Sequence, residues 1–569
     1  DAQIQRLQEG AQWAYGLHAD PRGARLALRT SLLMKGRIID LGALAQRRER
    51  SLLTDPNQHL GVTELQSLRQ QLLQHELSRS TQETSQYERL RRELALRIEE
   101  AEQVLAIKER GTVKFSEQLP SPEELVSKVA SSIAADGALL ELLWVRPYDF
   151  RTLGLRDEQR WQPPRYVALL LFPSGRLEVR DLGAAAVIDR QAQGLIEALR
   201  GRNADWLEHS KALYRSVLAP FSDSLTKVRR LTISPDGMLN LIPFDVLHDG
   251  RQDLLSRFDL LVYLTSGRDV LRRPSQQPTT PPIVVADPDF SAVIPGEPPL
   301  PASDGITVTQ SHAEAGLYDL SRAVGPLPGT ASEAQYIHQL RPDTRLLLGS
   351  AATERSVHEV RSPQFLVFAT HGVFLSRKEA ERWSAERAAG SGLSRGLSRP
   401  VGRLPPSDGT EHPTTQHNPM SATALLLAGA GRAAHGMDPA IDGHLLAEEA
   451  RLLDLSGTAL VVLSACDTGL GEVENSQGVV GLRRAFQVAG AEALVTSLWR
   501  VDDKGTSDLM RVYWRLVLRG QPRLGALRQA MRQIKKSRPH PYFWAPFIGI
   551  GLDVPLPSKS PKSIAVPTH

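Results

Sequence analysis

An apolar run that ends at the chain's only cysteine is the feature that most restricts what this chain can fold into. Leu460 to Ser464 form an apolar, β-branched run of strand length, which predicts a buried strand. The run stops at a small, polar turn that begins with Ala465, Cys466 and Asp467 and contains glycine. In an open α/β sheet, ligands and reacting groups collect at the carboxyl ends of the strands. We therefore expect the cysteine at a reactive edge of a sheet.

A second apolar run ends in a histidine. Phe365 to Ala369 has strand length and is followed by Thr370, His371 and Gly372. His371 and Cys466 would face each other only if the two strands were neighbours in one parallel sheet. A thiol protease needs that arrangement, because a base beside the thiol activates it as a nucleophile. Taken alone, Cys466 could equally be a small buried apolar residue.

From residue 118 onward, strand-like and helix-like segments alternate. This alternation predicts an α/β fold with a mostly parallel sheet covered by helices. We expect two lobes, residues 118–280 and residues 281–555, with the histidine and cysteine strands both in the second. An insertion at residues 376–417 has almost no apolar periodicity, which is typical of functional or disordered loops. Residues 556–569 are expected to be a disordered tail.

Residues 1–117 are expected to be helical almost throughout. Apolar residues recur three and four positions apart among Arg and Glu, which predicts a helical hairpin or bundle. This region could be a solvated spacer or the end of a helical repeat array. Because it carries no catalytic constellation, we expect it to bind a regulatory protein or an upstream repeat or sensor region. The chain opens on Asp1 without methionine, so a fragment or a processed product is expected.

The composition excludes several classes of function. Hydrophobic residues make up 41% and charged residues 23% of the 569 residues, values that are typical of soluble globular proteins. A formal net charge of +4 does not favour nucleic acid, and no apolar run approaches the ~20 residues of a membrane helix. One cysteine excludes an intrachain disulfide framework and favours a reducing compartment, so we expect a cytoplasmic protein.

No metal and no cofactor are expected from the motifs. The fifteen histidines include no HExxH and no paired Cys/His spacing of the kind that binds zinc. Gly469 and Gly471 follow the cysteine strand, but the third glycine of a dinucleotide fingerprint and a Walker lysine are both missing. Phosphate binding at this turn is therefore disfavoured.

An ordered set of motifs resembles the CHAT proteases, which are caspase-like domains related to separase and commonly fused behind tetratricopeptide repeats. The motifs are, in order, Ser234-Pro235-Asp236-Gly237 with Leu241-Ile242-Pro243-Phe244, Thr265-Ser266-Gly267-Arg268-Asp269, Leu327-Pro328-Gly329-Thr330, Ala369-Thr370-His371-Gly372, Ser464-Ala465-Cys466-Asp467-Thr468-Gly469, Ser497-Leu498-Trp499-Arg500-Val501-Asp502-Asp503 and Tyr542-Phe543-Trp544-Ala545-Pro546-Phe547. The likeness spans roughly Leu119 to Gly551. Two departures stand out: Arg500 replaces the proline that is typical of the family, and a long insertion follows His371.

The resemblance implies a caspase-like cysteine endopeptidase that cleaves a protein partner. It implies an inactive pseudo-caspase lobe followed by a catalytic lobe, with His371 and Cys466 as a dyad and no third catalytic residue. The backbone N–H groups of Gly372 and Cys466 would stabilise the oxyanion. The family's roles in bacterial antiviral defence and programmed cell death are further implications. The alternative is a catalytically silent caspase-like scaffold that binds proteins, against which the intact His371 and Cys466 argue.

Three aspartates are candidates for substrate recognition. Asp467 follows the cysteine directly, and Asp502 and Asp503 follow the next strand-like run, Ala493 to Trp499. Consecutive parallel strands end on the same side of a sheet, so these carboxylates would lie near the thiol and favour Arg or Lys before the cut. Alternatively, Asp502 and Asp503 cap the helix that follows them, and Asp467 bonds the backbone of its own turn.

Overall fold

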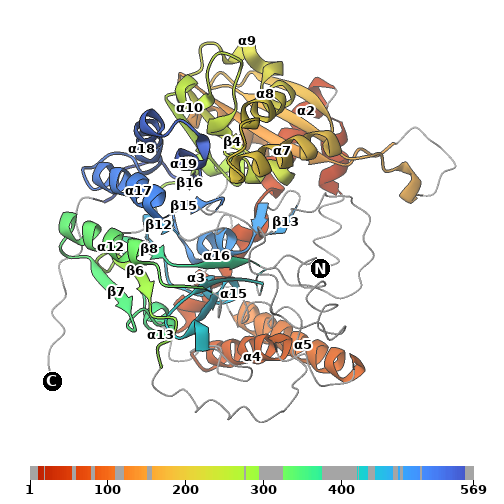
Figure 1. Ribbon diagram of the computed structural model, residues 1–569. Coiled ribbons are helices and arrows are strands. Elements are labelled where there is room, and N and C mark those ends of the chain that lie inside the picture. Colours follow the sequence, from red (N-terminus) through yellow and green to blue (C-terminus); the bar gives the residue numbers. More distant parts are fainter. Residues whose placement is uncertain are drawn as a thin grey trace, which may run out of the picture.

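The computed structural model describes residues 10–17, 20–53, 59–77, 84–108, 121–149, 157–274, 277–293, 324–374, 420, 422–432, 442–464, 472–474, 478–499 and 503–557. Over these ranges the chain is an α/β protein with additional helices at the amino-terminal side (Figure 1). The insertion predicted at residues 376–417 lies outside the described residues, as do residues 558–569 of the tail predicted at residues 556–569. The first two residues of that predicted tail are described: Leu556 packs against the core, and the Pro557 carbonyl accepts a hydrogen bond from Gln364.

An 11-stranded sheet runs through the molecule in the order β3-β2-β1-β4-β5-β16-β15-β12-β8-β6-β7. The strands are, in that order, Leu177–Ala184, Arg165–Leu171, Gly137–Val145, Arg230–Ser234, Leu260–Tyr263, Phe547–Gly551, Ala493–Ser497, Leu460–Leu463, Phe365–Ala369, Ile283–Pro288 and Arg345–Gly349. Only the pairs β3–β2, β2–β1 and β16–β15 are antiparallel, and the other neighbours are parallel. The predicted fold class, a mostly parallel sheet flanked by helices and preceded by a helical region, is confirmed.

The direction of the sheet reverses between β16 and β15. Strand β16 comes from near the end of the chain and lies between β5 and β15, which are separated by more than 200 residues in sequence. Because β16 and β15 are antiparallel, the carboxyl ends of β1, β4 and β5 lie at one end of the sheet. The carboxyl ends of β15, β12, β8, β6 and β7 lie at the opposite end.

In the first half of the sheet, alternate residues of β1 contribute to two different cores. Leu140 and Leu142 pack with α7 (Ala185–Arg200) and α8 (Trp206–Val217). Leu139 and Leu143 pack on the other face with α2 (Pro21–Met34) and α6 (Pro122–Ser132). Period-two alternation of this kind is expected of a strand that is buried on both faces. Helix α2 therefore shares a hydrophobic core with the first half of the sheet.

In the second half, the two faces of β8 contact different helices. The ring of Phe365 lies 5.0 Å from that of Trp514 on α17 (Asp503–Val517). The ring of Phe368 lies 5.5 Å from that of Phe486 on α16 (Leu482–Ala489). Residues three apart on a strand point to opposite faces, so α17 and α16 cover opposite sides of the sheet, and α12 (Pro328–Leu340) packs against α17.

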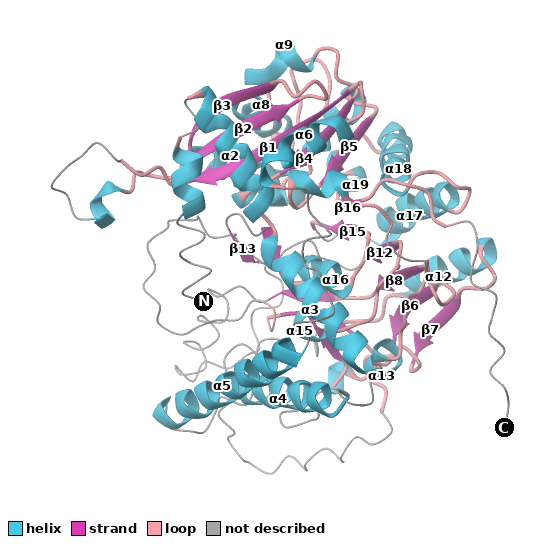
Figure 2. Cartoon of the chain, turned by 180° about the vertical axis from the view of Figure 1, so that it is seen from behind, coloured by secondary structure: helices cyan, strands magenta, loops and turns pink. Residues whose placement is uncertain are grey.

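The amino-terminal helices continue from the first half of the sheet to the second. Helix α3 (Arg37–Leu53) packs against α16, with Gly42 facing Val488. Helices α4 (His59–Leu77) and α5 (Thr84–Lys108) pack against each other as the predicted helical hairpin. In both views the hairpin lies below α15 (Ala447–Ala450), on the side away from the first half of the sheet (Figures 1 and 2). Among the described residues, no helix combines the length and the hydropathy that crossing a bilayer would require.

Candidate active site at the carboxyl ends of β8 and β12

The histidine strand β8 and the cysteine strand β12 are adjacent and parallel. Val462 pairs with Val367 and Leu463 with Phe368, and the Ser464 amide donates to the Phe368 carbonyl at 2.8 Å. The prediction that the two strands are neighbours in one parallel sheet is confirmed. His371 follows Phe368 by three positions, and the cysteine follows Leu463 by the same number, so the register favours their meeting at one end of the sheet.

His371 is oriented by a backbone carbonyl group. Its Nε2 atom lies 2.9 Å from the carbonyl oxygen of Gly325. A carbonyl oxygen only accepts hydrogen bonds, so Nε2 carries the proton and Nδ1 of the neutral ring is the basic atom. The ring packs against Phe290 at a centroid distance of 5.5 Å, and the residue is 5% exposed. The imidazole is therefore held in one orientation and one tautomer.

A second, three-stranded antiparallel sheet holds the backbone after His371. It consists of β11 (His444–Leu446), β10 (Thr423–Leu426) and β9 (Gly372–Phe374). Gly372 pairs with Leu425, and the Leu426 amide donates to the His371 carbonyl at 2.9 Å. Gly372, the predicted oxyanion donor, is thus placed in a defined strand at the end of β8.

A buried carboxyl group lies beside the end of the cysteine strand. Glu333 on α12 is 2% exposed, and its Oε2 accepts a hydrogen bond from the Ser464 hydroxyl at 3.3 Å. Its Oε1 accepts from Nε1 of Trp514 at 3.1 Å. Burial raises the pKa of Glu333 to about 7, although the hydrogen bonds from Trp514 and Ser464 oppose the rise. This carboxyl group therefore changes protonation near neutral pH. Its partner Ser464 precedes Cys466 by two positions in the sequence.

Several predicted site residues lie outside the described residues. These are Cys466, Asp467 and Asp502, together with the side chain of Asp503, the first residue of α17. Strand β15 is parallel to β12, so Ser497 ends β15 at the same end of the sheet as Leu463. The roles of the cysteine and the three aspartates stay predictions.

Two groups of the site were missed by sequence reasoning. The Gly325 carbonyl orients the histidine, but a backbone oxygen leaves no signal in residue types. The sequence does not single out Glu333, because a glutamate in a helix is ordinarily exposed. The signal that could have found it is its place in the motif region after Leu327-Pro328-Gly329-Thr330.

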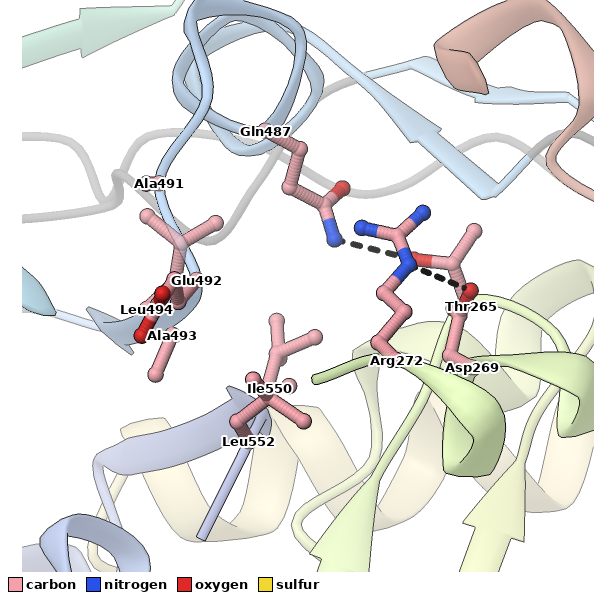
Figure 3. A pocket seen from close by; sticks show the side chains of 11 residues that line it. Thr265, Asp269, Arg272, Gln487, Ala491, Glu492, Ala493, Leu494, Ile550 and Leu552 are labelled. Carbon is pink, nitrogen blue, oxygen red and sulfur yellow. Dashed lines mark hydrogen bonds and ion pairs between the residues drawn. The ribbon is translucent and has the colours of Figure 1, made fainter. Parts of the chain in front are cut away.

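A small pocket lies away from this site. It opens between Thr265, Arg272 and Gln487, beside the amino end of β15 and the carboxyl end of β16 (Figure 3). Gln487 Nε2 donates to Thr265 Oγ1 at 3.0 Å, which joins the two halves of the molecule across the pocket. Because Ser497 and His371 lie at the other end of the strands, this pocket is distinct from the candidate active site.

Comparison with known proteins assigns the chain to a family. Residues 207–552 match the CHAT domain model. Tetratricopeptide repeat protein 28 of Homo sapiens is 29% identical over 363 residues, which are 62% of this chain and 13% of that protein. The protein of the same name from Mus musculus is 28% identical over 366 residues, again 62% of this chain and 13% of the relative. The chain thus spans only about an eighth of the length of these curated relatives.

Two solved structures of proteases are also similar. The Arg-specific cysteine proteinase gingipain R has a TM-score of 0.32 at 9% identity, covering 65% of this chain and 74% of the proteinase. The Saccharomyces cerevisiae separase–securin complex has a TM-score of 0.38 at 8% identity, covering 80% of this chain and 31% of the matched chain. The family match covers more than half of the present chain, and the chain therefore belongs to the CHAT domain family.

Proposed function

We propose that the chain is a cysteine endopeptidase in which His371 and Cys466 act as a dyad. The observation that carries the proposal is the parallel register of β8 and β12, in which Phe368 pairs with Leu463. His371 Nδ1 would take the thiol proton and later protonate the leaving amine. The Cys466 thiolate would attack the scissile carbonyl, and the backbone N–H groups of Gly372 and Cys466 would stabilise the oxyanion.

The orientation of His371 supports this assignment. A general base needs an oriented ring with an unprotonated basic nitrogen, and the Gly325 carbonyl favours that state of Nδ1 by accepting the Nε2 proton. A third side chain is not required to orient the ring, because the hydrogen bond from Nε2–H to the carbonyl oxygen selects the Nε2–H tautomer. The Gly325 oxygen therefore acts as a positioning group for the dyad.

The test is a proteome-wide cleavage screen with the full chain and its variants. Cys466→Ala and His371→Ala should each reduce cleavage by several orders of magnitude, because the members of a nucleophile–base pair act as a unit. His209→Ala, a partly exposed histidine in the first half, should cleave like the wild type. Cleavage that survives in Cys466→Ala would refute the assignment. A wild type that binds proteins but cleaves none would favour the scaffold function instead.

The second part of the proposal is specificity for Arg or Lys before the cut. Asp467 is the first candidate, because it is adjacent to the nucleophile in sequence, and Asp502 and Asp503 follow β15, whose end lies beside that of β12. A carboxylate in the cleft would bind a guanidinium or ammonium through charge-assisted hydrogen bonds. A fluorogenic peptide panel that varies this one position tests it: Asp467→Asn should lose the preference for Arg. Preference for Asp or for an uncharged residue would contradict the proposal.

The third part is control by the amino-terminal helices. Helix α3 packs on α16, the helix that follows the cysteine turn, and Gly42 faces Val488 there. A regulatory protein or upstream repeat array that binds α4 and α5 would act on α16 through α3. The curated relatives are named as tetratricopeptide repeat proteins and are much longer than this chain, which supports a repeat array as that partner. An activator must bind the active arrangement more tightly than the inactive one.

A further inference from the structure

Three side chains that commonly bind metals meet between two short helices, outside the candidate active site. Glu354 and His358 lie on α13 (Glu354–His358), and Glu449 lies on α15. One ligand atom from each residue lies within 4.8 Å of the other two. Glu354 and His358 are four positions apart, so they share one face of the helix.

Within the described part of the chain, neither carboxylate oxygen of Glu354 makes a hydrogen bond of good geometry, although the residue is only 1% exposed. An isolated buried carboxylate is strongly unfavourable. Its neighbour Glu449 is also buried, and Oε2 of Glu449 accepts from the Leu446 amide at 2.8 Å. Two such carboxylates need either a shared proton or a cation between them.

The position of His358 favours a cation. Its Nε2 atom lies 3.4 Å from Oε1 of Glu354, longer than a typical N–H···O hydrogen bond of about 2.9 Å. This separation is close to the edge, about 3.4 Å, of a tetrahedron with metal–ligand bonds of about 2.1 Å. A shared proton would need no imidazole beside it.

We propose that Glu354, His358 and Glu449 form a site for a divalent cation, and that this cation is zinc. Magnesium and calcium prefer sites made of oxygen ligands alone, whereas zinc accepts imidazole nitrogen and carboxylate oxygen together in a four-coordinate site. Water would supply the fourth ligand. The side chain of His358 is 33% exposed, which leaves a path for the ion from solvent.

The site would stabilise the small sheet beside His371. Helix α15 directly follows β11, and the Leu427 amide, just after β10, donates to the Gly443 carbonyl at 2.7 Å. On the other side, the carbonyl of Ala352, just before α13, accepts from the Ala428 amide at 2.9 Å. A cation between α13 and α15 would therefore stabilise the two segments to which the end of β10 is hydrogen-bonded. Strand β10 in turn supplies the Leu426 amide that donates to the His371 carbonyl.

The experiment measures zinc binding by the full chain in a Cys466→Ala background, which removes the thiol as a competing ligand. The protein is dialysed against a chelator and then titrated with Zn²⁺ by isothermal titration calorimetry. The number of bound zinc ions per chain is measured by inductively coupled plasma mass spectrometry. We expect one zinc per chain and, on binding, slower amide hydrogen exchange at residues 423–428. Glu354→Gln and His358→Gln should each weaken binding by on the order of 100-fold or more.

The matched control is Glu359→Gln, an exposed glutamate next to His358, which should bind zinc like its parent. His358→Gln keeps the test decisive if Glu354→Gln fails to fold, because His358 is only partly buried. Absence of zinc uptake by the parent would mean that a shared proton neutralises the two carboxylates, and would overturn the proposal. Equal uptake by the parent, Glu354→Gln and His358→Gln would overturn it as well, by placing the zinc elsewhere.

Discussion

Lys35 and Glu141 form an ion pair with an Nζ–Oε1 distance of 3.0 Å, and both side chains are almost completely buried. Lys35 directly follows helix α2, and Glu141 lies in the middle of β1. The same Nζ donates to the carbonyl oxygens of Leu142 and Ser234, each at 2.9 Å. The pair therefore fixes the amino-terminal helices at the carboxyl end of β4, the end of the sheet opposite to His371.

Lys35→Met should lower the free energy of unfolding by about 3–5 kcal/mol, because Glu141 would remain buried without its counter-charge. Urea unfolding followed by circular dichroism measures the change. Lys128→Met is the control: it removes an exposed ion pair with Glu124 on α6, so the midpoint should not move. Equal midpoints for Lys35→Met and the wild type would show that the buried pair does not form.

Glu333→Gln should remove a pH dependence of stability. The pKa of Glu333 in the folded chain is about 7, against an ordinary value of 4.5. The folded state thus holds the proton more tightly, so the stability is fully present below pH 4.5, falls as the pH rises toward 7 and is then constant. The loss amounts to about 3 kcal/mol, and Glu333→Gln should be more stable than the wild type at pH 8 by up to that amount.

Unfolding free energies of the wild type and Glu333→Gln at pH 5 and pH 8 measure this effect. The other titrating groups contribute equally in both proteins, so their contributions cancel in the difference. Glu64→Gln, an exposed glutamate on α4, is the control and should follow the wild type at both pH values. A Glu333→Gln variant with the same pH dependence as the wild type would mean that Glu333 stays charged beside Ser464.

The neighbouring positions of β8 and β12 could be predicted because buried parallel strands are apolar on both faces. Their runs are continuous and of equal length, which is typical of such strands. The position of β16 between β5 and β15 could not be predicted in this way, because it depends on pairing between segments that are far apart in sequence. The periodicity also predicts a helix over residues 478–489, but Gly478–Val480 pairs with Glu472–Glu474 instead, because tertiary pairing outweighs local propensity.

Within the site, residue types predicted the histidine strand but not what orients its imidazole. His371 was expected to act without a third group, yet its Nε2 lies against the Gly325 carbonyl. That contact joins segments that are 46 residues apart, and any residue could supply the oxygen. Glu333 was equally hidden, because its burial depends on how α12 packs against Trp514.

The neutral imidazole of His371 should be the Nε2–H tautomer. In a Cys466→Ala variant labelled with ¹⁵N-histidine, the Nε2 resonance is expected at the shift of a protonated nitrogen and Nδ1 at that of an unprotonated one. His371→Gln provides the assignment by removing one pair of signals. Gly325→Ala retains the carbonyl and has free space for the added methyl group, so its tautomer should be unchanged. The opposite tautomer in the wild-type ring would exclude Nδ1 as the base.

Arg50 on α3 connects the amino-terminal helices to both sides of the cysteine strand. Its Nη1 donates to Ser456 Oγ at 2.9 Å and pairs with Asp454 at 3.1 Å, in the loop before β12. Its Nη2 bonds to the carbonyls of Leu453 and of Ala489, which ends α16. Arg50 thus contacts the segment that leads into β12 and the helix that follows the cysteine turn.

Removal of residues 1–117 would be a poor test of regulation, because it also removes α2 and Lys35 from the core. Arg50→Ala removes the polar contacts of α3 with the second half and leaves α2, Lys35 and the packing of α3 on α16 in place. If α3 transmits control, this change should alter kcat for a cleaved peptide by about fivefold or more, at a temperature where circular dichroism shows a folded chain. Arg50→Lys should give nearly the same kcat as Arg50→Ala, because an ammonium group cannot replace the planar set of donors of a guanidinium. Arg22→Ala, on the exposed side of α2, should cleave like the wild type. An Arg50→Ala variant that does the same would exclude the Arg50 contacts as the route of control.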